Sequence, residues 1–319
     1  MMPETFKTGR IVYLSCLGLD IYMLASIAAQ LSMATASTFL ISVTEAVNDS
    51  LASLDGLIML AAVSLGLVLM MLFACEQQEK GYLFEGTTVK KAFFEKNESC
   101  GITNIISFAA ILLVLQLISM IVLSVVELVL NLSGYTISQS PAMNADYTQS
   151  FSLMLYAMLA GPIIEELVFR GFLLKALKPC GRRFAIFVSA LMFSLMHADV
   201  QQLFITFCAG LLFAYVAMRY SIKVSIVLHI INNALFSELL MYMQEVLSDE
   251  LFVIIMMSLF VLSIIITDFY LLRHKNEISG YLRDVRNSAG AYKALLNRWF
   301  IAFAAFSVAE TFMTISYFS

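Results

Sequence analysis

Charged side chains are scarce in this chain of 319 residues: Asp, Glu, Lys and Arg make up 13% of it, against 61% hydrophobic residues. A soluble domain carries about a quarter charged residues, so the chain has too little polar surface to cover soluble domains. A soluble enzyme and a secreted scaffold are therefore excluded. The net charge of −4 provides no basic stripe for nucleic-acid phosphates. The composition predicts an all-α, polytopic membrane protein instead.

The cysteines form no pattern typical of a disulfide framework or a metal site. The five cysteines are odd in number, scattered and never spaced CxxC, so they provide neither a disulfide framework nor a zinc knuckle. No internal repeat, low-complexity run or extramembrane domain appears. The chemistry of this protein therefore has to come from residues within its apolar segments.

Long apolar runs dominate the chain. About 20 such residues cross a bilayer as a helix, and the sequence contains nine segments of this kind: 11–34, 53–75, 102–132, 150–174, 184–199, 200–219, 222–243, 251–272 and 299–318. Grouped by the polar motifs described below, they give three parts: residues 1–149 with three spans, a motif-bearing core at 150–243, and residues 244–319 with the last two spans.

Basic residues fix the orientation of these spans. Eighteen of the nineteen Lys and Arg residues fall before the first span or after the second, fourth, sixth and eighth. The remaining connections contain none, and the positive-inside rule makes the basic side cytoplasmic. The sequence thus predicts a cytoplasmic N-terminus and an extracytoplasmic C-terminus in the cell membrane.

The nineteenth basic residue, Arg170, lies inside the fourth span together with Glu165 and Glu166. Each such group costs about 2.5–3.5 kcal/mol near the centre of a membrane helix, so function is the default explanation. Glu166 and Arg170 are four residues apart and can pair on one helix face. Glu165 lies about 100° around the helix and faces something else. Pro162 predicts a kink just before the acidic pair.

Two of the three histidines also lie inside spans. His197 follows Phe193 by four residues, and His229 precedes Asn233 by four, which puts an imidazole and a carboxamide on one helix face. A desolvated glutamate can act as a general base, an imidazole opposite it can hold the same water, and a second imidazole with an amide can stabilise an oxyanion. Together these groups can hydrolyse an amide without a covalent intermediate.

The three motifs resemble those of the CPBP family, the CAAX-protease and bacteriocin-processing intramembrane endopeptidases, which includes the Abi proteins. They are EExxxR at Glu165, Glu166 and Arg170, FxxxH at Phe193 and His197, and HxxxN at His229 and Asn233. Any one motif is weakly specific, but all three occur in the family's order over about 70 residues.

The resemblance implies an eight-helix core around a cavity open to the cytoplasm and the lipid; the span at 299–318 would be a ninth helix. It also implies that Glu165 activates water with His197 as its partner, and that His229 and Asn233 form the oxyanion hole. Glu166 and Arg170 would be a supporting pair with Phe193 nearby. No cofactor is expected, although Glu165, His197 and His229 could ligate zinc.

Three functions remain open at this stage. The first is an intramembrane endopeptidase acting on a membrane-embedded or lipidated peptide or protein, in bacteriocin self-immunity or peptide processing. The second is a proton-coupled transporter, since buried Glu, Arg and His also build proton relays. The third is a non-catalytic membrane immunity or scaffold protein of the Abi type. The expected partners of the protease are this substrate and the lipid bilayer, and no nucleic acid is expected.

Overall fold

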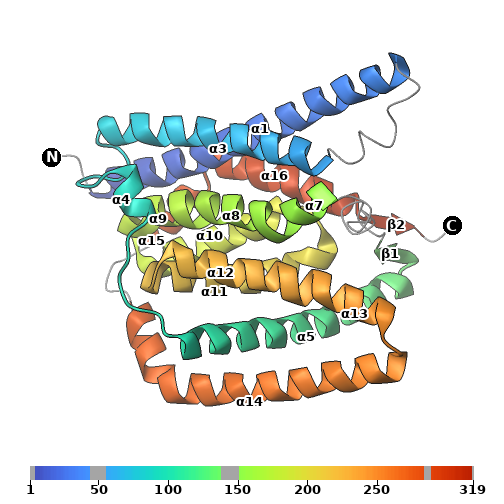
Figure 1. Cartoon of the computed structure of the whole chain (residues 1–319). Coiled ribbons are helices and arrows are strands. Elements are labelled where there is room, and N and C mark those ends of the chain that lie inside the picture. Colours follow the sequence, from blue (N-terminus) through green and yellow to red (C-terminus); the bar gives the residue numbers. More distant parts are fainter. Residues whose placement is uncertain (1–3, 44–54, 138–150, 284–288, 318–319) are drawn as a thin grey trace.

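A computed structural model describes residues 4–43, 55–137, 151–283 and 289–317, and it is a bundle of long helices lying side by side (Figure 1). The regular helices are α1 Glu4–Val43, α3 Asp55–Glu79, α4 Val89–Phe93, α5 Ile102–Leu132, α10 Arg182–Met196, α11 Val200–Arg219, α12 Ile222–Asn233, α14 Asp249–Leu282, α15 Ala289–Leu295 and α16 Arg298–Phe312.

Two further stretches are continuous but change their helical geometry along the way. Residues 151–180 run through α7 Phe151–Leu155, π-helical η1 Tyr156–Ala160, α8 Gly161–Glu166, π-helical η2 Leu167–Leu173, α9 Leu174–Leu177 and 3-10 turn η3 Lys178–Cys180. Similarly, α12 continues through π-helical η4 Ala234–Leu239 into α13 Leu240–Val246. The first stretch carries the EExxxR motif and the second carries HxxxN.

The polytopic all-α fold is confirmed. Each of the nine predicted spans contains a helix, and six helical stretches among the described residues are long and apolar enough to cross a membrane. The helices α10, α12 and α16 are shorter, at 15, 12 and 15 residues. The predicted fifth span is displaced: its helix begins at Arg182 and ends at Met196, which leaves His197 at the cap.

The only β-structure among the described residues is one short pairing that the sequence did not predict. Strand β1 Tyr135–Ile137 follows α5 and pairs antiparallel with β2 Ile315–Tyr317, which follows α16. Glu127 of α5 accepts hydrogen bonds from the Ile137 N–H at 3.0 Å and the Thr136 hydroxyl at 2.5 Å. The end of α16 is thereby tied to the end of α5.

The bundle has two ends that differ in their connections. The N-terminus, α4 and α15 lie at one end, and β1, β2 and the C-terminus lie at the other (Figure 1). Both long basic connections thus share the end of the N-terminus, as the distribution of Lys and Arg predicted.

One apolar core joins all three parts of the chain defined from the sequence. Leu19 of α1, Phe172 of η2 and Phe303 of α16 are fully buried in the same cluster. The proposed boundary between 149 and 150 lies outside the described residues, and the one between 243 and 244 falls within α13. Helices from both ends of the sequence therefore surround the motif-bearing segment.

Candidate active site

The helix that carries the two glutamates departs from α-helical geometry around Pro162. The Gly161 N–H donates to the Tyr156 carbonyl five residues back, and Pro162 has no N–H to offer. The Ala157 carbonyl, which would otherwise receive one of these two donors, accepts from Asn233 Nδ2 at 3.0 Å. The irregularity predicted at Pro162 is thus a π-helical turn, and it links the EExxxR helix to the HxxxN helix.

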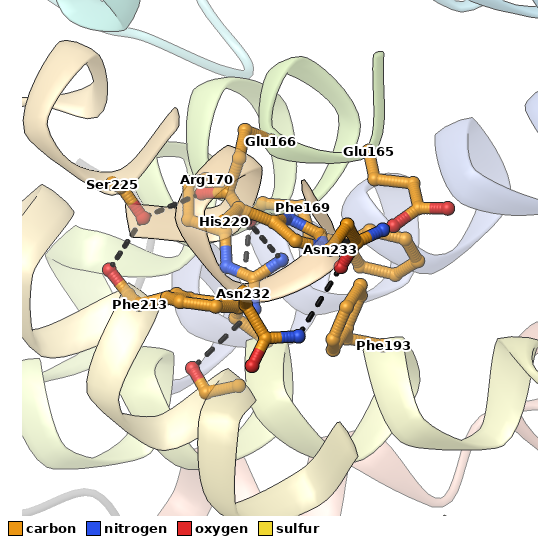
Figure 2. Close-up of polar contacts among 12 residues, drawn as sticks. Glu165, Glu166, Phe169, Arg170, Phe193, Phe213, Ser225, His229, Asn232 and Asn233 are labelled. Carbon is orange, nitrogen blue, oxygen red and sulfur yellow. Dashed lines mark hydrogen bonds and ion pairs between the residues drawn. The ribbon is translucent and has the colours of Figure 1, made fainter. Parts of the chain in front are cut away.

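Glu166 is the centre of a buried polar network (Figure 2). Its Oε1 lies 3.0 Å from Arg170 Nη1, and both side chains are fully buried. The Ser225 hydroxyl donates to Oε2 at 2.6 Å. Because both carboxylate oxygens are engaged by the protein, Glu166 holds the site together and is not available to substrate.

His229 lies between the two glutamates. Its Nδ1 is 3.0 Å from Glu166 Oε1, and its Nε2 is 3.6 Å from Glu165 Oε2. The ring stacks on Phe213, with the two centroids 4.7 Å apart at an interplanar angle of 24°. Each ring nitrogen thus faces a carboxylate, and the contact with Glu166 orients the ring so that Nε2 points toward Glu165.

Arg170 is enclosed by aromatic rings. Its guanidinium carbon lies 4.2 Å from the Phe193 ring centroid and 5.4 Å from that of Phe213, which are favourable cation–π distances. Its Nη2 donates to the Gly210 carbonyl at 3.4 Å. The same Phe193 packs edge-on against His197, with centroids 4.8 Å apart. Phe193 therefore connects the charged pair to both histidines.

Glu165 has a different environment from its neighbour. Its side chain is 30% exposed, and it leaves the helix in a different direction from Glu166 (Figure 2). It lies in the wall of a cavity of about 250 Å³ that His197 also lines. The His197 Nδ1 contacts the Phe193 carbonyl at 2.9 Å, so Nδ1 carries the proton and the lone pair of Nε2 remains available to the cavity.

The structure thus places Glu165 and His197 in one cavity wall without a direct contact between them among the described residues. It places Glu166, Arg170, His229 and Phe193 in the adjoining network. Asn233 reaches the same region but gives one amide hydrogen to Ala157, and its Oδ1 accepts from Asn232 Nδ2 at 3.2 Å. An oxyanion role for Asn233 depends on its second amide hydrogen.

Sequence reasoning missed several residues of this region. Ser225 precedes His229 by four residues, so the spacing that paired His229 with Asn233 would have found it one turn earlier. Phe213 and Gly210 of α11 carry no motif. Phe306 and Ser307 of α16, and Tyr22 and Tyr156, also line the cavity. The ninth helix is therefore part of the cavity wall, which no local pattern indicated.

Comparison with known protein families identifies what the motif-bearing segment is similar to. Residues 147–235 match the family model described as type II CAAX prenyl endopeptidase Rce1-like. This segment is Rce1-like. The resemblance predicted from the three motifs is confirmed over it, and at the family level it supports a protease. No curated protein and no solved structure matches the chain.

The Rce1-like segment also provides the residues named above as alternative zinc ligands. Within the described ranges, no three His, Cys, Asp or Glu side chains come close enough together to hold a metal ion. In this arrangement Glu165, His197 and His229 do not form a ligand set. A chelator therefore tests whether zinc takes part in the reaction.

Proposed function

We propose that this protein is an intramembrane endopeptidase that hydrolyses a peptide bond with water activated by Glu165. The observation that carries the proposal is the contrast between two adjacent carboxylates. Glu166 is fully buried and bound to Arg170, Ser225 and His229, whereas Glu165 faces a cavity that also presents His197. Two neighbouring acids in different environments are typical of a site in which one reacts and the other supports it.

In the proposed first step, water lies between Glu165 and the lone pair of His197 Nε2. Glu165 takes one proton from this water, and the water oxygen attacks the carbonyl carbon of the peptide bond. Negative charge develops on the carbonyl oxygen. The Nε2–H of His229, held by Glu166 from the opposite side of the ring, donates to that oxygen, together with the second amide hydrogen of Asn233.

In the second step the carbon–nitrogen bond breaks. Glu165, now a carboxylic acid, returns its proton to the departing amine nitrogen, and the other product leaves as a carboxylic acid. No covalent enzyme intermediate forms, and Glu165 regains its starting state. Glu166 and Arg170 act as positioning residues throughout because both side chains are fully buried and paired with each other.

The cavity wall favours an apolar segment as substrate. Met23, Ile27, Val63, Phe169 and Phe306 line it together with the polar groups. A membrane-embedded or lipidated peptide or protein fits such a wall. We propose that the enzyme cleaves such a substrate in bacteriocin self-immunity or in peptide processing. We place the enzyme in the cell membrane with its N-terminus in the cytoplasm.

The test measures whether the detergent-purified full chain cleaves a fluorogenic lipidated peptide or any of a small panel of hydrophobic peptides. Wild type is compared with Glu165→Gln, and Glu76→Gln serves as the matched control because Glu76 is exposed and pairs with Lys80 four residues later. Removing the general base should lower kcat by about 10²–10⁴-fold. Glu76→Gln should behave as wild type.

Each outcome assigns a function. If Glu165→Gln abolishes cleavage and a zinc chelator has no effect, the glutamate-dependent reaction stands. If the chelator abolishes cleavage, the reaction is zinc-dependent and the proposed metal-independent mechanism is wrong. If no peptide is cleaved, and Glu165→Gln and His197→Ala both retain bacteriocin resistance in cells, the scaffold function replaces the protease. Proton flux that depends on Glu165 in vesicles would favour the transporter.

A further inference from the structure

A second cavity, of about 650 Å³, lies at the end of the bundle that carries the N-terminus. It is walled by the start of α1, the turn at 82–87, α4 and the α9–η3 segment, and it shares no residue with the cavity at Glu165. Its volume falls within the roughly 300–1,000 Å³ typical of small-molecule sites. We propose that this cavity binds a phosphate-bearing anion.

The lining is positively charged. It contains the lysines Lys7, Lys91, Lys175 and Lys178 and the glutamates Glu85 and Glu95. Lys7 pairs with Glu85, while Lys175 and Lys178 share the single carboxylate of Glu95. Four lysines against two glutamates leave a net charge of two positive. A phosphate group supplies the opposite charge and several acceptor oxygens.

Lys175 is the most deeply buried of the four lysines, and its charge is only partly compensated. Its side chain is only 1% exposed, and its Nζ lies 3.2 Å from Glu95 Oε2, an oxygen that Lys178 approaches at 2.8 Å. A buried ammonium needs full compensation of its charge, and here it receives part of one carboxylate. The two lysines therefore leave an uncompensated positive charge beside the cavity.

Lys91 provides a further cation on the α4 wall. Its side chain is exposed, and within the described ranges it has no ion-pair partner. The helix that carries it is capped by Thr88, whose Oγ1 accepts from the Lys91 N–H at 3.2 Å. This cation is available to a ligand without the breaking of an existing ion pair.

The turn that forms the third wall is held in place by packing. Phe84 has a positive φ of 54°, a strained conformation for a residue other than glycine, which persists only where the surroundings enforce it. Its buried ring packs against Phe93 of α4 and Phe172 of η2, with both centroid distances 6.2 Å. The cavity is therefore preformed around this aromatic anchor.

The phosphate can come from a lipid headgroup or from a free phosphorylated molecule. Basic pockets between transmembrane helices on the cytoplasmic side bind anionic headgroups, and the distribution of Lys and Arg predicts that this end is cytoplasmic. Both sources share the same chemistry, so the experiment uses one probe for each: inorganic phosphate and phosphatidylglycerol.

The experiment follows thermal unfolding of the detergent-purified full chain at constant ionic strength. Phosphate is titrated against chloride, and phosphatidylglycerol is compared with phosphatidylcholine. A saturable rise in Tm is expected with the anionic probes. Lys91→Gln should raise the half-saturating concentration about fivefold, since one lysine near an anionic headgroup contributes about 1 kcal/mol. Lys90→Gln, on the same helix but outside the cavity, should leave it unchanged.

A response to both probes supports a phosphate site open to free ligands, and a response to phosphatidylglycerol alone supports a headgroup site. The proposal is overturned if neither probe gives a saturable response, or if Lys90→Gln weakens binding as much as Lys91→Gln. Glu165→Gln should keep the full response, which separates this test from that of the proposed protease.

Discussion

At the scale of single residues, the site depends on the different surroundings of Glu165 and Glu166. Adjacent positions on a helix point about 100° apart, so one side chain enters the buried network and the other enters the cavity. The fully buried pair of Glu166 and Arg170 lowers the cost of placing either charge inside the bundle. Each of the two charges therefore compensates the other inside the bundle.

This pairing predicts that Glu166→Gln fails for a different reason than Glu165→Gln. Removing one charge of a buried pair leaves the other uncompensated, at a cost of about 3–5 kcal/mol. Glu166→Gln should lower the Tm and lose activity, whereas Glu165→Gln should keep its Tm. Adding Arg170→Met should restore much of the lost Tm but not the activity. A Glu166→Gln protein as stable as wild type would contradict this account.

Glu95 predicts a pH dependence of stability at the N-terminal end of the bundle. Partial burial raises the pKa of its carboxyl, but Lys178 and Lys175 outweigh that effect and hold the pKa below its usual 4.5. A group with a depressed pKa in the folded state stabilises above its unfolded pKa, and this contribution is lost as pH falls through the folded value. Stability should therefore fall below about pH 4.5.

The measurement is Tm as a function of pH between 7 and 3. Glu95→Gln should already show the lowered stability at pH 7 and should respond less to acid. Glu76→Gln, a surface control paired with Lys80, should follow the wild-type profile. An unchanged acid response in Glu95→Gln would assign the pH dependence to other carboxyl groups.

At the scale of helices, close approach between α1 and α3 positions one wall of the active-site cavity. A Cβ at Gly66 would lie 2.2 Å from Ser26 Oγ and 2.6 Å from the Tyr22 carbonyl, and Tyr22 and Ser26 both line the cavity. Gly66→Ala should therefore cost about 1–3 kcal/mol through overpacking and reduce activity. Gly9→Ala, with nothing within 4 Å of its Cβ, is the matched control, and equal Tm values for the two variants would contradict the prediction.

The ninth helix should influence substrate binding more than the chemical step. Phe306 lines the cavity but lies on α16, outside the motif-bearing segment. Phe306→Ala should raise KM about tenfold, the scale of lost pocket contacts, with kcat nearly unchanged. Phe312→Ala, on the same helix but 67% exposed, should change neither constant. A fall in kcat with constant KM would instead give Phe306 a role in the reaction.

The sequence predicted elements well because apolar runs and basic residues report directly on membrane crossing. The ranges 102–132 and 200–219 agree with α5 and α11 at both ends. His197 was placed inside a helix and lies at its cap, since an apolar run does not mark where a short helix ends. The contacts of Phe213 and Phe306 depend on which helices become neighbours, and no local pattern encodes that.

At the scale of the whole molecule, the two ends of the bundle are chemically distinct and should face different compartments. Lys96 lies in the connection after α4, on the end of the N-terminus, whereas Ser133 follows α5 at the end of the C-terminus; both are exposed. In a background without the five native cysteines, a membrane-impermeant maleimide should label Ser133→Cys in intact cells. Lys96→Cys should be labelled only after permeabilisation, because the positive-inside rule places it in the cytoplasm. The reversed pattern would invert the orientation, and labelling of both from outside would contradict an odd number of crossings.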